Sequence, residues 1–149
     1  MIYAGVGARL TPYGVLNKMR LIAEQKAREG WILRSGGALG ADTAFYLGAK
    51  ACEDSYEIFT ANSIIPKWAM EIAEKHHPAW HILNSYAKKL MARNVMILCG
   101  NTSEAPKQSE IVDEMICWTP GGIITGGTGH TMRVANSFNI PIRNLYKEM

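Results

Sequence analysis

Three glycine-rich segments, each placed after a short apolar run, constrain the fold of this 149-residue chain more than any other feature. They occupy residues 5–9, 35–42 and 126–131, and each is followed, directly or after a few residues, by a stretch with helical spacing. In an open α/β sheet such turns lie where strands end and helices begin, which is where ligands bind. Glycine lets backbone N–H groups approach an anion closely, and a helix N-terminus adds a favourable dipole. The three segments therefore predict one pocket for a phosphate-bearing molecule.

The composition is that of an ordinary globular chain. Hydrophobic residues make up 48% of it and charged residues 19%, which is enough for one domain spanning residues 1–149. No apolar run approaches the ~20 residues that a membrane span requires, and the start of the chain has no basic segment or cleavage site of a secretory signal. We therefore expect a cytoplasmic protein with no membrane partner.

Charge and cysteine content argue against several classes of site. The net charge of +3 is milder than the dense basic face of a dedicated nucleic-acid binder. Cys52, Cys99 and Cys117 are odd in number and lack CxxC spacing, which predicts reduced thiols in the core. His76 and His77 have no carboxylate or cysteine partner at metal spacing. We expect no metal ion and no cofactor.

Short apolar segments alternate with helical spacing along the chain. Strands are predicted at residues 2–6, 31–34, 56–60, 113–118 and 140–145. Helices are predicted from Thr11-Pro12 to Gly30, from Asp42 or Thr43 to Ala51, over 66–92 with a break at His77-Pro78, and over 131–139. The run 95–99 fits either a buried strand or a continuing helix. This alternation predicts an α/β fold, a single Rossmann-like domain whose parallel sheet has helices on both faces.

The glycine segments also resemble those of a known family. Residues 5–9, 11–14 and 35–42 are similar to motifs of the DNA-processing protein A (DprA/Smf) family, within the SLOG superfamily of Rossmann-like proteins. Residues 93–100 resemble that family's Arg-Asn stretch, which opens a helix near the ligand pocket and so favours helix for 95–99. Residues 126–129 resemble the Gly-Gly-x-Gly-Thr signature of the lysine-decarboxylase-like (LOG) branch, whose members release bases from nucleoside 5′-monophosphates.

Two substitutions separate the chain from both sets of relatives. Leu39 stands where the DprA pattern has an arginine, and an apolar side chain cannot pair with a phosphate. Arg133 stands where the LOG signature has a glutamate tied to base release, and an arginine cannot act as a general acid or base near neutrality. Because the chain ends at Met149, we also expect it to lack the extra domains that many DprA proteins carry. These departures weaken the expectation of either activity.

The candidate ligand-binding residues lie in the three glycine segments and beside them. They are Gly7, Arg9, Ser35, Gly36, Gly37, Gly40, Asp42, Thr43, Arg93, Asn94, Gly126, Gly127, Thr128, Gly129, His130 and Thr131. Backbone N–H groups and threonine hydroxyls would bond phosphate oxygens, and the planar fork of arginine suits an anion. Asp42 could equally cap its helix or bond a ribose hydroxyl. His130 could donate a proton or contact the ligand. No catalytic residue is assigned.

Three functions are consistent with these motifs, in descending order. The first is binding of a nucleotide or a nucleotide-derived small molecule, for sensing or sequestration, because the glycine turns come without a matched acid–base pair. The second is a LOG-like N-glycosidase, for which the candidate carboxylates are Asp42, Glu104, Glu110 and Glu114. The third is DprA-like binding of single-stranded DNA, which the mild charge and Leu39 disfavour. Relatives self-associate, so a homo-oligomer is also expected.

Overall fold

A five-stranded parallel sheet runs through the computed structural model, which describes residues 1–149. Its strands are β1 (Ile2–Gly5), β2 (Ile32–Ser35), β3 (Tyr56–Ile58), β4 (Glu114–Cys117) and β5 (Ile142–Asn144). Their order is β3-β2-β1-β4-β5, and all four pairings are parallel. The chain therefore builds outward from β1 in one direction and then returns to its other side. The prediction of an α/β Rossmann-like fold with a parallel sheet is confirmed.

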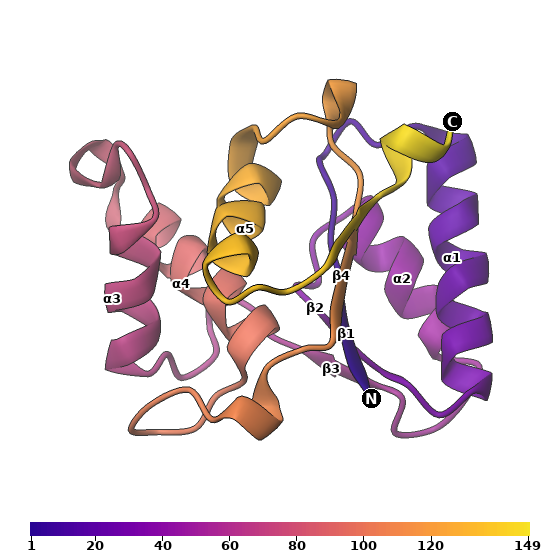
Figure 1. Ribbon diagram of the computed structural model, residues 1–149, viewed down its shortest axis with the longest axis horizontal. Helices are drawn as coiled ribbons and strands as arrows, with labels where there is room; N and C mark the ends of the chain where they lie inside the picture. Colours follow the sequence, from indigo (N-terminus) through magenta and orange to yellow (C-terminus); the bar gives the residue numbers. More distant parts are fainter.

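Helices cover both faces of the sheet (Figure 1). One face carries α1 (Tyr13–Arg28) and α2 (Ala41–Ala49), and the other carries α3 (Lys67–Lys75), α4 (Ser85–Cys99) and α5 (Gly126–Ser137). Successive side chains of a strand point to opposite faces, and the two cores follow that period. Tyr3 packs in the core under α1 and α2, whereas Ala4 packs in the core under α4 and α5. None of the helices combines the length and the apolar character needed to cross a membrane.

The two helices on the first face pack closely because a glycine lies between them. The buried residues of α1 include Val15, Met19 and Ala23, which recur every four positions and form one apolar stripe. Gly48 of α2 faces this stripe, and a Cβ there would overlap the carbonyl oxygen of Arg20 and lie 2.9 Å from the backbone nitrogen of Glu24. Only glycine permits this approach of one helix backbone to another.

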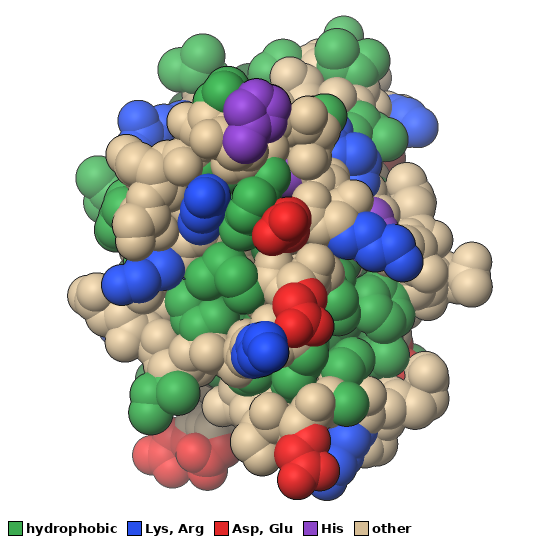
Figure 2. Space-filling view, turned by 90° about the vertical axis from the view of Figure 1, so that its left-hand side faces the viewer, with side chains coloured by type: hydrophobic (Ala, Val, Ile, Leu, Met, Phe, Trp, Pro, Cys, Tyr) green, Lys and Arg blue, Asp and Glu red, His purple; other side chains and the backbone are tan.

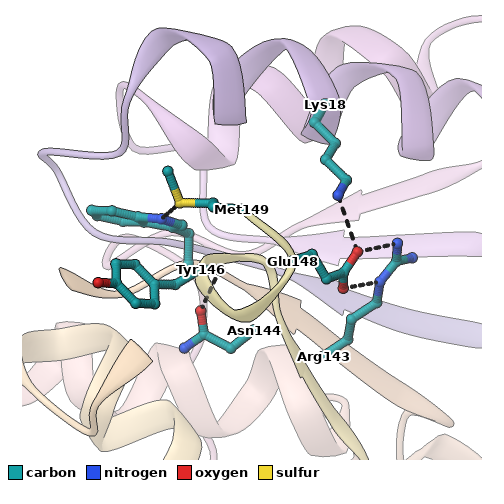
Figure 3. Close-up of polar contacts among 7 residues, drawn as sticks. Lys18, Arg143, Asn144, Tyr146, Glu148 and Met149 are labelled. Atoms are coloured by element: carbon teal, nitrogen blue, oxygen red, sulfur yellow. Dashed lines mark hydrogen bonds and ion pairs between the residues drawn. The ribbon is translucent and has the colours of Figure 1, made fainter. Parts of the chain in front are cut away.

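The end of the chain is tied back onto α1 and β5 by the short 3₁₀ helix η4 (Leu145–Glu148) (Figure 3). The Glu148 carboxylate accepts hydrogen bonds from Arg143 at 2.7 and 2.9 Å and from Lys18 at 3.0 Å. These bonds, the Arg143 bond first, lower the pKa of Glu148 to about 2. Because the three side chains are a third or more exposed, the pairing is worth less than about 1 kcal/mol.

The structure corrects several predicted boundaries. Residues 95–99 are helical and form the last turn of α4, so Arg93 lies inside that helix. The third glycine segment is itself the first turn of α5, which begins at Gly126 and not at Thr131. Glycine is typical of turns, so sequence alone placed this segment before the helix. The predicted break at His77-Pro78 is confirmed, because α3 ends at Lys75 and a 3₁₀ turn precedes α4.

Two predicted helix caps are also wrong. Thr11 does not cap α1, since its hydroxyl donates to the Ala8 carbonyl at 2.5 Å and Pro12 takes the cap position. Neither Asp42 nor Thr43 is the cap of α2, whose N-cap is Gly40 with φ +92°. Backbone conformation decides this position, because a residue with a side chain rarely adopts that φ.

Candidate functional site

The three glycine segments meet around one cavity of about 660 Å³ at the carboxyl ends of the strands. It lies where the strand order reverses, between the segment that follows β1 and the segment that follows β4. Open α/β sheets bind their ligands at such a switch point. Eleven of the candidate residues line the cavity: Gly7, Arg9, Gly36, Gly37, Asp42, Arg93, Asn94, Gly126, Gly127, Thr128 and Thr131.

The N-terminus of α5 presents free hydrogen-bond donors to this cavity. The amide groups of Gly126, Gly127 and Thr128 donate to no backbone or side-chain acceptor, whereas the Gly129 amide already bonds the Thr125 carbonyl at 2.8 Å. Thr125 takes the N-cap position but its side chain caps nothing. Three unpaired N–H groups at the positive end of a 12-residue helix form a site suited to an anion.

Two neighbouring residues of α4 connect the second and third glycine segments across the cavity. Arg93 Nη1 donates to the carbonyl oxygens of Gly36 at 3.0 Å and Phe59 at 3.3 Å. Asn94 is buried, and its Nδ2 donates to the Gly127 carbonyl at 3.4 Å. Adjacent residues on one helix therefore hold both segments in place.

The guanidinium of Arg93 carries a charge that no ion pair neutralises. No carboxylate oxygen lies within 4.0 Å of it, and its Nη2 makes no hydrogen bond. Burial lowers the pKa of Arg93 from its usual value, while the negative charge of Asp42 opposes that shift. Arginine nevertheless stays protonated in proteins, so the cavity contains a cation that makes no direct ion pair and has the charge of Asp42 nearby.

Asp42 and Arg93 both approach the space where a side chain of Gly36 would lie. Oδ2 of Asp42 accepts the Ala38 amide at 3.1 Å, and the Asp42 side chain is buried. Burial raises the pKa of Asp42, and the bond from Ala38 and the charge of Arg93 oppose that shift. A Cβ on Gly36 would lie 2.6 Å from Oδ2 of Asp42 and closer still to Nη1 of Arg93. A glycine is therefore required where these two opposite charges approach.

Five predicted site residues do not line the cavity and take structural roles. Ser35 Oγ donates to the Gly5 carbonyl at 2.5 Å, and Thr43 Oγ1 donates to the Ala38 carbonyl at 2.9 Å. Gly40 is the N-cap of α2. Gly129 packs against the backbone of Ile124, which would lie 2.9 Å from a Cβ at this position. The first three support the second glycine segment from outside the cavity.

The prediction that the fifth residue, His130, contacts the ligand is wrong, because its side chain points away from the cavity into the core. It is 0% exposed, and its Nε2 lies 3.1 Å from the Ala73 carbonyl at the end of α3. Burial, assisted by the charges of His77 and Arg133, lowers the pKa of His130 to about 4. Adjacent residues on a helix point to different sides, so His130 turns away from the cavity when Thr131 faces it. The sequence prediction placed both residues in a turn, where this rule does not apply.

The predicted site residues included none of the apolar side chains that form one wall of the cavity. Tyr86, Leu90 and Met91 of α4 line it together with Arg93 and Asn94. Once Arg93 and Asn94 are placed on a helix, residues three, four, seven and eight positions earlier share their face. That spacing was the available signal, and it was hidden because residues 95–99 also fit a strand.

The residues required for base release are not gathered in the cavity. Of the four candidate carboxylates, Asp42 lines the cavity and Glu104, Glu110 and Glu114 do not. Arg133 also lies outside it, with its Nε donating to the His76 carbonyl at 3.1 Å. General acid–base catalysis uses a proton-transferring group within hydrogen-bond reach of the substrate, and glycosidases commonly pair two. One carboxylate and one arginine do not make that pair.

No family model matches this chain, and no curated protein matches its sequence. Among solved structures, its fold is similar to that of DNA processing protein A from Helicobacter pylori, whose structure is described as showing a unique single-stranded DNA binding mode. The two are 14% identical with a TM-score of 0.56, and the similarity covers 97% of this chain and 64% of that one. At this identity the likeness establishes a shared fold, and it agrees with the DprA-like resemblance of the glycine segments.

Proposed function

We propose that this chain binds a nucleotide, or a phosphate-bearing small molecule derived from one, in the cavity between its three glycine segments. The observation that carries the proposal is the set of three unpaired amide groups at the start of α5, opening into the cavity that Arg93 also lines. A phosphate bound there would accept hydrogen bonds from the helix N-terminus and neutralise the arginine.

The size and the walls of the cavity favour an organic ligand over a bare ion. Its volume of about 660 Å³ lies within the ~300–1,000 Å³ of small-molecule pockets. The apolar side chains of Tyr86, Leu90 and Met91 form one wall, and aromatic and aliphatic surfaces of this kind accept the flat face of a base. With no second catalytic group in reach, sensing or sequestration is the role that these residues support.

Titration calorimetry with the four common ribonucleoside 5′-monophosphates tests the proposal, with Gly127→Ala as the decisive variant. A Cβ on Gly127 meets only the Met91 Cε at 3.8 Å, so the fold tolerates it while a methyl group enters the anion site. We expect binding to fall by about tenfold or more, because charge-assisted hydrogen bonds are worth about 1.5–3 kcal/mol each.

Gly14→Ala is the matched control, because a Cβ there contacts nothing within 4 Å and the residue lies on α1, outside the cavity lining. It should leave binding unchanged. Binding by neither the native chain nor the control would refute the proposal, as would equal binding by Gly127→Ala and the native chain.

Single-stranded DNA is the second candidate, because the solved structure with this fold is described for that binding mode. Other features disfavour it. On the face seen in Figure 2, Lys and Arg side chains are interspersed with Asp and Glu. Leu39, 89% exposed, replaces the arginine of the DprA pattern. If DNA is the ligand, affinity for a labelled oligonucleotide must fall steeply as salt rises, with a slope of about −0.7 per phosphate contact.

A further inference from the structure

Asp42 is the acidic side chain that lines the cavity, and its carboxylate would not itself bind a phosphate. Only 6% of the residue is exposed, so the fold fixes the position of its carboxylate and solvent reaches little of it. A phosphate cannot approach this carboxylate without like-charge repulsion. Whatever part of a ligand lies against Asp42 must therefore be a hydrogen-bond donor.

The structural role of Asp42 uses one of its two oxygens. Oδ2 accepts the Ala38 amide and so holds the second glycine segment in its turn. The Ser35 hydroxyl and the Gly36 amide also lie near enough to oppose the rise in the pKa of Asp42, but neither makes a well-formed hydrogen bond to Oδ1. Oδ1 is not a fully buried unpaired atom, so it is accessible. A carboxylate oxygen with free lone pairs, on a residue that lines the cavity, is available to a ligand.

The polar groups of the cavity come from two sides. The unpaired amides lie at the start of α5, whose first turn Asn94 bonds, and the Asp42 carboxylate lies beside Arg93 at Gly36. A ligand that fills this space presents an anionic group at the α5 end and hydroxyl or amine donors at the Asp42 end. A ribose 5′-phosphate has this polarity, with its phosphate at one end and two vicinal hydroxyls on the ring.

We infer that the cavity binds the ribose of a nucleotide, with Asp42 Oδ1 accepting a hydrogen bond from a ribose hydroxyl, and so selects ribonucleotides over sugars that lack both vicinal hydroxyls. This inference rests on the proposed function and adds the sugar class of the ligand. The carboxylate then positions the ribose, while Arg93 and the α5 amides bind the phosphate. A sugar that lacks both hydroxyls leaves the buried carboxylate without its donor, which is the arrangement that polar sites discriminate against most strongly.

Calorimetric titration of the native chain tests this with each of the four ribonucleoside 5′-monophosphates and its 2′,3′-dideoxy counterpart. For the nucleotide that binds, we expect the dideoxy form to bind about tenfold or more weakly, as for the loss of one hydrogen bond to a charged group. Dideoxy forms that bind within about twofold of the ribonucleotides overturn the inference and leave the proposed function standing. Absence of binding by every ribonucleotide refutes the proposed function itself.

Asp42→Asn assigns the effect to this residue, because an amide oxygen can still accept the Ala38 N–H. We expect it to weaken ribonucleotide binding by about tenfold and to leave dideoxynucleotide binding unchanged. The matched control is Asp113→Asn, which replaces an exposed carboxylate that also accepts a backbone amide, that of Ile2 at 2.9 Å. Equal weakening of both ligands in Asp42→Asn overturns the inference. Should that variant fail to fold, the comparison of sugars on the native chain still decides.

Discussion

Gly36 holds the site together at the scale of a single residue. Its missing side chain leaves room for both the Arg93 guanidinium and the Asp42 carboxylate. Sequence reasoning selected Gly36 because glycine lets backbone N–H groups approach an anion, and its φ is not in the left-handed region, whereas that of Gly37 is +84°. The requirement at Gly36 is space, which depends on a residue 57 positions away and is invisible in the local sequence.

Gly36→Ala is therefore expected to abolish nucleotide binding with only a modest effect on stability. The new methyl group displaces the ends of two side chains and not backbone, so the free energy of unfolding should fall by about 1–2 kcal/mol. Calorimetry and urea unfolding of the same preparation measure both quantities. A variant that binds nucleotide as the native chain does would show that Arg93 and Asp42 are not held as described.

His130 makes the stability of the chain depend on pH. Its Nε2 faces the Ala73 carbonyl, which can only accept, so the ring donates from Nε2 and its buried Nδ1 is left unpaired and unprotonated. A proton on Nδ1 would have no acceptor. The pKa of about 4 lies below the ordinary value of 6.5, so the unfolded chain binds the proton more readily than the folded one. The contribution of neutral His130 to the free energy of unfolding is therefore fully present above pH 6.5 and is lost as the pH falls towards 4.

We expect this loss to approach about 3 kcal/mol between pH 6.5 and 4, at about 1.4 kcal/mol per pH unit. Urea unfolding at a series of pH values measures it. His130→Gln should flatten the profile over this range, whereas His81→Gln, which replaces an exposed histidine, should not. A profile that is unchanged in His130→Gln would place the pH dependence elsewhere.

At the scale of elements, the contact between α1 and α2 sets the geometry of the second glycine segment, which enters α2. Gly48 allows the two helix backbones to approach so closely that no side chain fits between them at this position. The alternation of strands with helices, and the apolar stripe of α1, were predictable because burial imposes periods of 2 and 3.6 residues. The start of α5 was not predictable, because glycine has a low helix propensity and only tertiary packing holds these glycines in a helix.

Gly48→Ala should destabilise the chain even though alanine has the higher helix propensity. The clash is with backbone atoms of α1, so the helices must move apart, at a cost of about 2 kcal/mol or more. For a chain of this size that lowers Tm by roughly 4–8 °C. Gly14→Ala should instead change stability by between zero and about 1 kcal/mol in the favourable direction. Equal thermal melting of the two variants would contradict the described packing.

At the scale of the whole molecule, the order of the strands creates the site. Because the chain leaves β3 and returns to the free side of β1, the turns after β1 and β4 diverge and leave a crevice. The glycine segments predicted this convergence from sequence. The apolar wall from Tyr86 to Met91 and the inward turn of His130 were not predicted, because both depend on which side of a helix faces the sheet, and that is a property of packing.

The convergence of the three segments on one ligand is the central claim, and amide chemical shifts test it most directly. Adenosine 5′-monophosphate, which carries both a phosphate and a ribose, is titrated into ¹⁵N-labelled chain. We expect the amides of Gly7, Gly37 and Gly127 to shift together and to saturate at the same nucleotide concentration. Shifts confined to one segment, or found on a surface away from the cavity, would contradict it.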